Sequence, residues 1–184
     1  MVVASHLVTA EDLLRMPRDG WRYELVEGEL RRMPPPGFQH GATAGEISGR
    51  LYIHVHAHDL GVVPAAETGF KLHSEPDTVR AADVSFVSRQ RLDSTSFDEE
   101  GYFPGAPDFV VEVVSPSDSF ADVQEKVYLW LDGGAKLVLV VLPKKHSCFV
   151  YRPGAPVQRL GSSDTLDASD AVPGWSLDLG EILK

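Results

Sequence analysis

Two carboxylates and one lysine are the residues of this sequence whose types and spacing could do chemistry. Asp83 stands within the strand-like run 81–87, and Glu112 interrupts the apolar run 109–114. A charged side chain within an apolar strand is costly unless it is paired or binds a metal. Lys126 follows on a predicted helix, at the border of the apolar face, where it can lean back toward the sheet. We therefore expect the three side chains to approach one another.

This combination suits hydrolysis of a phosphate ester with a divalent cation. Carboxylates from two adjacent strands can hold Mg²⁺, which accepts few protein ligands and keeps several waters. A bound cation makes its water more acidic and polarises a phosphoryl oxygen. Lys126 would orient or deprotonate the attacking water, or neutralise the charge that develops on the phosphate.

Each of these residues also has a simpler interpretation. Glu112 could be a buried acid in a structural ion pair, because such pairs also perturb buried carboxylates. Asp83 could be a capped or paired strand residue. Asp122 and Lys126 are four residues apart, which on a helix is the spacing of a surface ion pair worth about 0.3–0.5 kcal/mol. The interpretations differ in whether the three side chains point toward one place.

The N-terminal half of the chain predicts two helices and several strands. Ile47, Leu51 and Val55 recur every four residues, which gives the longer helix one apolar face. The expected elements are a helix at 10–16 behind the capping pair Thr9 and Asp12, strands at 21–26 and 29–33 around the turn Glu27-Gly28, a rigid proline loop at 34–37, a helix at 42–58, and strands at 62–64, 68–73 and 81–87.

The C-terminal half contains one strand–helix–strand unit. The runs 109–114 and 136–142 are continuous and rich in β-branched residues, which is typical of buried strands. Ser119 with Asp122 forms a capping-box pattern, and the helix that it opens should end near Asp132. Since a helix connects the two strands, they should be parallel neighbours.

Four further elements are expected in this half. They are an apolar helix face of Phe120, Val123, Val127, Trp130 and Leu131, an irregular segment at 89–107, a strand at 146–152 paired with 136–142, and a hairpin-like tail at 157–184 anchored by Trp175.

Composition limits the kind of protein that this can be. The chain has 184 residues, 43% hydrophobic and 24% charged, so we expect a single globular domain over 1–184. No apolar run approaches the roughly 20 residues of a membrane span, so no membrane partner is expected. The net charge of −10 argues against a general nucleic-acid coating protein, but not against an enzyme that meets a phosphodiester through a cation. The single cysteine, Cys148, makes a reducing cytoplasm the simplest location.

Several sequence blocks together resemble a known family. They are Tyr23-Glu24-Leu25 with Glu27-Gly28-Glu29-Leu30, Pro34 to His40, Asp83 to Val87, Val111 to Ser117 with its glutamate and Ser-Pro-Ser, and Asp122 with Lys126. The sequence is similar to the Uma-type family of restriction-endonuclease-like proteins, part of the PD-(D/E)xK nuclease superfamily. The similarity extends over residues 21–175. It implies an α/β (α+β) restriction-endonuclease-like fold, a mixed β-sheet flanked by helices, here with N- and C-terminal hairpins.

The resemblance also implies a metal site and a substrate. Asp83 matches the superfamily's aspartate and Glu112 its second carboxylate, so both would bind Mg²⁺ or Mn²⁺. The carbonyl of Val113 would be a further ligand. The implied substrate is DNA, and the implied assembly is a homodimer, because a duplex has two strands to cut.

Three assisting residues follow from the resemblance as well. The superfamily's lysine, two residues after the glutamate, is replaced here by Val114, so Lys126 on the helix would take its place. His40 matches a recurring histidine, which could touch phosphate or support a carboxylate. Glu24 or Glu27 matches an extra acidic residue, and strand alternation puts these two on opposite faces. We assign the assisting role to Glu27.

The function expected is metal-dependent hydrolysis of DNA phosphodiester bonds, and two alternatives stay open. A catalytically inactive module that binds nucleic acid or protein would fit Val114 and the net charge of −10. A small phosphate-ester hydrolase would fit the acidity, and it would need a closed pocket rather than an open groove.

Other residues give weaker signals. Ser115 and Ser117 are not within a GxSxG nucleophile elbow, so they are expected to form a turn and cap a helix. His54 and His58 share a helix face but lack the glutamate of an HExxH zinc motif, which favours a solvated face. Cys148 is expected to be an inert strand residue.

Overall fold

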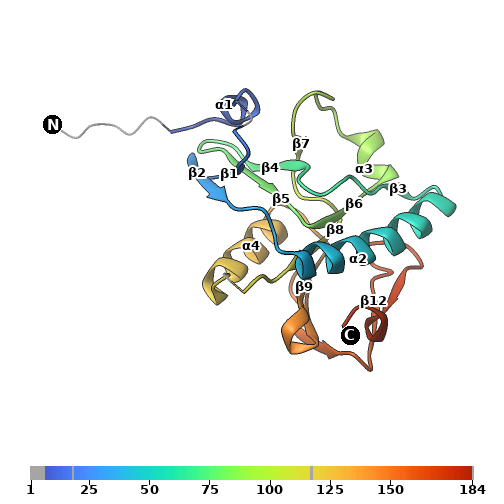
Figure 1. Ribbon diagram of the computed structural model, residues 1–184. Coiled ribbons are helices and arrows are strands. Elements are labelled where there is room, and N and C mark those ends of the chain that lie inside the picture. Colours follow the sequence, from blue (N-terminus) through green and yellow to red (C-terminus); the bar gives the residue numbers. More distant parts are fainter. Residues whose placement is uncertain (1–6, 18, 117, 184) are drawn as a thin grey trace.

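Figure 1 shows the protein as a computed structural model, in which residues 7–17, 19–116 and 118–183 are described. The helices are α1 (Ala10–Leu14), α2 (Phe38–Ala57), α3 (Arg89–Ser94) and α4 (Phe120–Asp132), with 3-10 turns at Pro143–Lys145 and Leu179–Glu181. The strands are β1 (Arg22–Val26), β2 (Glu29–Met33), β3 (Gly61–Val62), β4 (Gly69–His73), β5 (Thr78–Ala81), β6 (Val84–Ser88), β7 (Phe103–Pro104), β8 (Phe109–Val113), β9 (Leu137–Leu142), β10 (Ser147–Tyr151), β11 (Gln158–Gly161), β12 (Thr165–Asp167) and β13 (Ser176–Asp178).

A mixed sheet with the strand order β11-β10-β9-β8-β6-β3 forms the centre of the molecule. Strands β8 and β9 are parallel, from the pair Phe109 and Leu137 to the pair Val113 and Val141, and helix α4 connects them. This confirms the predicted strand–helix–strand unit. The pairs β6–β8, β9–β10 and β10–β11 are antiparallel.

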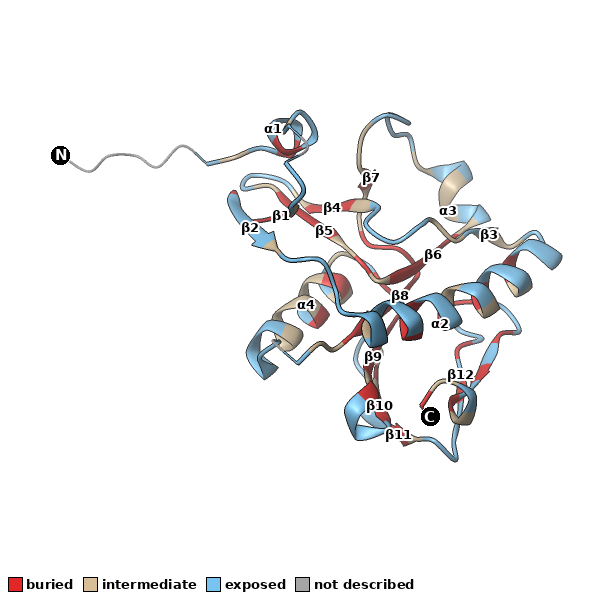
Figure 2. Ribbon diagram, viewed as in Figure 1, coloured by how far each residue is buried: buried red, intermediate tan, exposed pale blue. Residues whose placement is uncertain are grey.

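One helix covers each face of this sheet (Figure 2). On one face, Val111 and Val113 of β8 join the apolar side of α2 in a buried cluster. On the other face, Val110 of β8 packs with Val127 and Trp130 of α4. Alternate residues of β8 therefore point to opposite helices, as strand geometry requires. The prediction of a mixed sheet flanked by helices is confirmed.

The predicted hairpins lie at the two ends of the chain. Strands β1 and β2 pair antiparallel and belong to a second sheet, in the order β2-β1-β5-β4-β7, against which α1 packs. Strands β12 and β13 pair antiparallel near the C-terminal end. Trp175 is buried at 4% exposure, with its ring 5.4 Å from that of Phe109, so it anchors this hairpin as predicted.

The expected strand 81–87 is wrong, because the chain bends at Ala82 and Asp83 and forms two strands. Strand β5 ends at Ala81 and belongs to the second sheet, whereas β6 begins at Val84 and belongs to the central sheet. Asp83 therefore lies where the chain passes from one sheet to the other. The chain must bend at such a position, but the sequence has no glycine or proline there that would predict the bend.

Other features also differ from the predictions. Helix α2 begins at Phe38 rather than at 42, because Gly37, in an extended conformation, is its N-cap residue. His40 therefore lies in the first turn of the helix. The segment 89–107, predicted to be irregular, contains α3 and β7. Phe120, predicted to belong to the apolar face of α4, is 78% exposed and is the first residue of the helix.

Within the described ranges, no helix is long and apolar enough to cross a membrane. Ser117, for which a turn or capping role was expected, lies outside the described residues.

Candidate active site

Asp83 is held at the end of the central sheet by β8 and α2. The antiparallel register pairs Val84 with Val111, and continuing it by one residue sets Asp83 opposite Glu112. The backbone N–H of Val113 donates to Asp83 Oδ2 at 2.7 Å. His40 Nε2, from the first turn of α2, lies 3.1 Å from the same oxygen. The Asp83 carboxylate is therefore oriented by two neighbours that both contact Oδ2.

Glu112 leaves β8 on the face covered by α4. It is 5% exposed, and its Oε1 accepts a hydrogen bond from Trp130 Nε1 at 2.7 Å. Lys126 Nζ donates to Glu112 Oε2 at 3.0 Å. Lys126 and Trp130 lie four residues apart on α4 and so project from the same side of the helix. The expectation that Lys126 leans back toward the sheet is confirmed, and it pairs with Glu112 rather than with Asp122.

The protonation states of this pair follow from burial and charge. Burial raises the pKa of Glu112, and the Lys126 ammonium opposes that shift. The Glu112 carboxylate raises the pKa of Lys126 well above its usual range, with smaller contributions from Glu24 and Asp83. Lys126 is consequently a fixed positive charge at neutral pH, because the three carboxylates around it stabilise the ammonium form.

His40 is the second basic residue of the site. The hydrogen bond with Asp83 raises the pKa of His40, against a smaller opposing effect of burial. Nδ1 of the ring is buried and has no hydrogen-bond partner among the described residues. With Nε2 committed to Asp83, the histidine supports that carboxylate, which is one of the two roles expected for it.

Glu24 is the acidic residue of β1 that reaches this region. It is 2% exposed, its Oε2 accepts from Arg80 Nη1 at 2.6 Å, and its Oε1 accepts from the backbone of Ala81 at 3.2 Å. Arg80 Nη2 also donates a hydrogen bond of 3.3 Å to Glu125 Oε2 of α4. Arg31 of β2 binds the same carboxylate of Glu125 through two hydrogen bonds of 2.6 and 3.0 Å.

Arg80 was not recognised from the sequence. Its side chain is almost completely buried between Glu24 and Glu125. The available signal was an arginine in the apolar run Val79 to Ala82, just before Asp83, because a charge at such a position needs a buried partner.

Glu27 does not reach the site. It occupies the turn between β1 and β2 with φ at +50°, is exposed, and its backbone N–H donates to Thr78 Oγ1 at 3.0 Å. The expected approach of Glu27 to the site is therefore wrong, and Glu24, the other candidate, lines the same cavity as Asp83 and Lys126, because Glu27 lies in the turn after the end of β1.

A cavity of about 280 Å³ brings these groups together. We call it the site pocket. Its charged and polar lining consists of Arg22, Glu24, His40, Asp83, Ser115, Asp118 and Lys126, with a wall formed by Met33 to Gly37 and further contacts to Ala81, Val113 and Pro116. Glu112 lines a much smaller adjoining cavity of about 30 Å³, which shares Val113, Asp118 and Lys126 with the site pocket.

The donor set is compatible with one hard divalent cation. In the described part of the chain, no three His, Cys, Asp or Glu side chains are gathered as a metal cluster. Mg²⁺ needs no such cluster, because it is commonly held by one or two carboxylates and keeps its remaining waters. The opposed carboxylates Asp83 and Glu112, with the carbonyl of Val113, the residue after Glu112, provide oxygen ligands of that kind.

The weaker candidates have structural contacts or are buried. His54 Nε2 contacts the carbonyl of Pro173 at 2.9 Å, and His58 Nδ1 contacts the carbonyl of His54 at 2.8 Å, so each has a backbone partner. The backbone N–H of Ser115 donates a hydrogen bond of 2.7 Å to Asp118 Oδ2. Cys148 is buried, and burial raises the pKa of its thiol to about 12, which makes it unreactive at neutral pH.

Comparison with known proteins agrees with this architecture. Residues 10–180 match the family model Uma2, whose description is "Putative restriction endonuclease". The chain belongs to the Uma2 family. Among curated proteins, no sequence matches.

A solved structure similar to this Uma2-family chain comes from Anabaena variabilis and is described as a "putative nuclease". The two are 20% identical, the match covers 96% of this chain and 97% of that one, and the TM-score is 0.80. The predicted restriction-endonuclease-like fold is therefore confirmed, and so is the family that the sequence blocks indicated.

Proposed function

We propose that this Uma2-family protein is a metal-dependent endonuclease that hydrolyses DNA phosphodiester bonds. The observation that carries the proposal is the meeting of Asp83, Glu112 and Lys126 at one end of the central sheet. These residues come from three different parts of the fold: the bend before β6, strand β8 and helix α4. Family membership independently favours a nuclease.

Asp83 and Glu112 are the proposed ligands of Mg²⁺ or Mn²⁺, together with the carbonyl of Val113. When bound, such a cation would polarise a phosphoryl oxygen and increase the acidity of a nearby water. In the metal-free protein, Lys126 neutralises Glu112 and His40 contacts Asp83. These two basic side chains thus hold the carboxylates in place in the absence of a metal.

Lys126 is proposed to stabilise charge rather than to accept a proton. Its ammonium is stabilised by the carboxylates of Glu112, Glu24 and Asp83, so an unprotonated amine is disfavoured at neutral pH. A fixed ammonium at the edge of the pocket can orient the attacking water and offset the charge that develops on the phosphate. The alternative in which Lys126 removes the proton from water is therefore the less favoured one.

The shape of the site pocket favours a polymeric substrate over a small phosphate ester. Its wall includes residues 34–37, all of which are exposed, so the wall opens onto the surface. A small ester would need the enclosure that buries most of a ligand's surface. A phosphodiester within a DNA strand can instead enter from the side and leave at both ends.

The test compares metal binding and cleavage in isosteric variants. Asp83→Asn and Glu112→Gln keep the hydrogen-bond acceptors for Val113 and Trp130 but remove the negative charge. We expect calorimetry to show Mg²⁺ or Mn²⁺ binding by the wild type and its loss in both variants. Cleavage of plasmid and branched DNA should fall at least about 100-fold.

Asp108→Asn is the matched control. Asp108 is a fully buried carboxylate immediately before β8, at the other end of that strand, where it contacts Ser88 and Lys136. It should keep metal binding and cleavage. Equal cleavage by wild type and Asp83→Asn, or no cleavage of any nucleic acid by a metal-loaded wild type, would refute the nuclease proposal.

Two further parts of the proposal concern assembly and location. A homodimer is proposed because a duplex has two strands to cut, and sedimentation velocity should then give about twice the chain mass of 20.1 kDa. A reducing cytoplasm is proposed because the single cysteine is free and buried. A monomer at all concentrations would remove the dimer from the proposal.

A further inference from the structure

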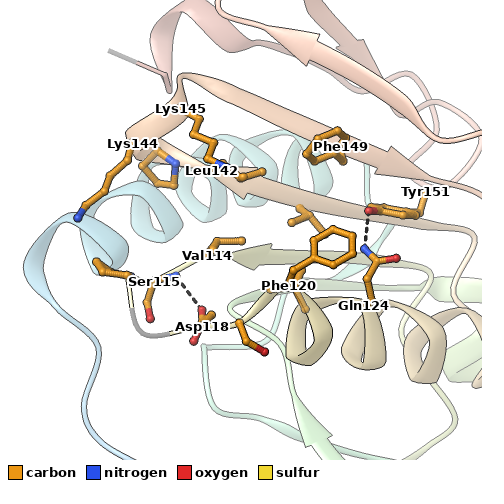
Figure 3. A pocket seen from close by; sticks show the side chains of 15 residues that line it. Val114, Ser115, Asp118, Phe120, Gln124, Leu142, Lys144, Lys145, Phe149 and Tyr151 are labelled. Carbon is orange, nitrogen blue, oxygen red and sulfur yellow. Dashed lines mark hydrogen bonds between the residues drawn. The ribbon is translucent and has the colours of Figure 1, made fainter.

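A second pocket lies beside the site pocket, between α4 and the β9–β10 hairpin (Figure 3). Its volume is about 270 Å³, and most of its lining is apolar. Phe120 and Val123 of α4 form one wall, and Leu142, Phe149 and Tyr151 of the hairpin form the other. We call it the aromatic pocket.

The aromatic pocket adjoins the site pocket. Both are lined by Ser115, Pro116 and Asp118, the turn that connects β8 to α4. This turn directly follows Val113, whose carbonyl is a proposed metal ligand. A strand whose phosphate lay at the metal would therefore have its neighbouring nucleotide at the opening of the aromatic pocket.

Phe120 gives this pocket an aromatic surface that the fold does not need. It is the first residue of α4 and is 78% exposed. Figure 3 shows its ring across the pocket from Phe149 and Tyr151, and the Tyr151 hydroxyl is fixed by Gln124 at 2.8 Å. Aromatic faces at an open pocket are the platforms on which unpaired bases stack.

Two lysines at the tip of the hairpin add positive charge to this opening. Lys144 and Lys145 are exposed, and among the described residues neither has an ion-pair partner. They form a local positive charge in a chain whose net charge is −10. The one acidic residue in the lining, Asp118, accepts the backbone N–H of Ser115 at 2.7 Å.

We propose that the aromatic pocket receives an unpaired base of the strand that is cut, with Phe120 stacking on the base and Lys144 and Lys145 contacting the adjacent phosphates. The inference rests on the proposed nuclease function and makes its substrate more specific. The pocket volume is at the lower limit of the roughly 300–1,000 Å³ of small-ligand sites, which suits one base rather than a helix or a folded domain.

The preferred substrate would then be single-stranded DNA or DNA with unpaired nucleotides next to the cleaved bond. A fully paired duplex would first have to unstack and flip a base, which costs free energy. Binding should therefore favour a single strand over a duplex of the same length, and this preference should depend on Phe120.

The test is fluorescence anisotropy with a short fluorescein-labelled oligothymidylate and a duplex of equal length. One series contains EDTA and a second contains Ca²⁺ as a probe cation, and gel electrophoresis verifies that the DNA stays intact. Phe120→Ala should weaken single-strand binding by about tenfold or more, the effect of losing one base–aromatic stack. Tyr128→Ala is the matched control, since Tyr128 is 68% exposed on the same helix but outside the pocket.

The outcomes separate this inference from the nuclease proposal. Equal single-strand affinity of wild type and Phe120→Ala, or no single-strand binding in either series, would overturn the pocket assignment even if the wild type cleaves DNA. Phe120-dependent binding by a protein that never cleaves would support the pocket and refute only the nuclease function. A dimer that Phe120→Ala abolishes, with DNA binding unchanged, would identify a second copy as the occupant and overturn the assignment.

Discussion

At the residue scale, Glu112 has a structural role in addition to its proposed role as a metal ligand. Its two oxygens separately accept the indole N–H of Trp130 and the ammonium of Lys126. Trp130 is fully buried, so its N–H has no access to water if the acceptor is lost. A single carboxylate thus keeps a core tryptophan satisfied and leaves one oxygen toward the site.

The first prediction separates the contribution of the Trp130 hydrogen bond to stability from the effect of removing the whole Glu112 carboxylate. Glu112→Ala should lower the free energy of unfolding by about 3 kcal/mol, because it leaves a buried N–H and a largely buried ammonium without partners. Glu112→Gln should cost less, since its amide oxygen can still accept from Trp130. Chemical denaturation by urea, followed by fluorescence, measures both values. Equal losses in the two variants would show that the indole hydrogen bond contributes nothing.

The second prediction concerns the His40–Asp83 pair and pH. The hydrogen bond raises the pKa of His40 above its usual value of 6.5. Its contribution to stability is therefore complete below pH 6.5, the unfolded-state value, and is lost as the pH rises through the folded-state pKa. His40→Gln should be destabilised by about 1 kcal/mol in acid and by less in alkali.

Urea unfolding in EDTA at two pH values, one below and one well above the usual histidine pKa, measures this difference without metal. His56→Gln provides the control, because His56 is an exposed residue of the same helix, where it stacks on Tyr52. A destabilisation of His40→Gln that stays constant with pH would mean that the imidazole is not protonated in the pair.

At the scale of elements, α4 organises both pockets. Its inward side carries Lys126 and Trp130 to Glu112, and its first turn carries Phe120 to the aromatic pocket. The helix begins with a capping box, in which Ser119 Oγ accepts from the N–H of Asp122 and the Asp122 carboxylate accepts from the Ser119 backbone. The position of this one helix start sets the geometry of both regions.

The third prediction tests that helix start. Ser119→Ala should lower the free energy of unfolding by about 1 kcal/mol, the usual effect of losing an N-cap side chain. Ser162→Ala, an exposed serine in the turn after β11, should change it by less than about 0.5 kcal/mol. Thermal and urea unfolding of the two variants provide the comparison. Equal effects would show that the cap is not what fixes α4.

The same helix explains what could be read from the sequence. Its start at Ser119 and its end at Asp132 were predicted correctly, because a capping box and Gly133 are local signals. The bend at Asp83 was missed, because it arises where the chain leaves one sheet at Ala81 and enters the other at Val84, and no local sequence signal marks that change. The β8–β9 pairing was predicted because a helical connection constrains it to be parallel.

The candidate site follows the same division. Asp83, Glu112 and Lys126 were recognised because their charges interrupt apolar patterns. The buried pair Glu24 and Arg80 was not, because its members are 56 residues apart and meet only when β1 and β5 align. Strand alternation alone could not choose between Glu24 and Glu27, because it does not show which side of β1 faces the site or that Glu27 lies beyond the end of the strand.

At the scale of the whole molecule, we propose that residues 1–184 form a single domain. The central sheet contributes β8 to the buried clusters on both of its faces, and the second sheet shares its Phe70 and Leu72 with the cluster beneath α4. Calorimetry should therefore give one transition, with the calorimetric enthalpy equal to the van't Hoff enthalpy. Two separate transitions would indicate independent units.

The net charge of −10 determines how this molecule should meet a polyanion. A basic binding protein makes many phosphate contacts, and its affinity falls steeply with salt because each contact releases counterions. In the metal-free protein, only Lys144 and Lys145 are proposed to contact phosphate. The affinity for a single strand should then fall by about sevenfold between 50 and 200 mM salt, since each contact on a single strand contributes a slope of about −0.7.

The double variant Lys144→Ala/Lys145→Ala should bind more weakly and lose most of this salt dependence, whereas Phe120→Ala should bind more weakly with the slope unchanged. Stacking involves no counterion release, so the two contributions separate in one titration series. A steep slope in the wild type would mean that a wider cationic surface contacts the DNA. A double variant with the wild-type slope would place the phosphates away from the hairpin tip, and the strand could not then follow the path from the site pocket into the aromatic pocket.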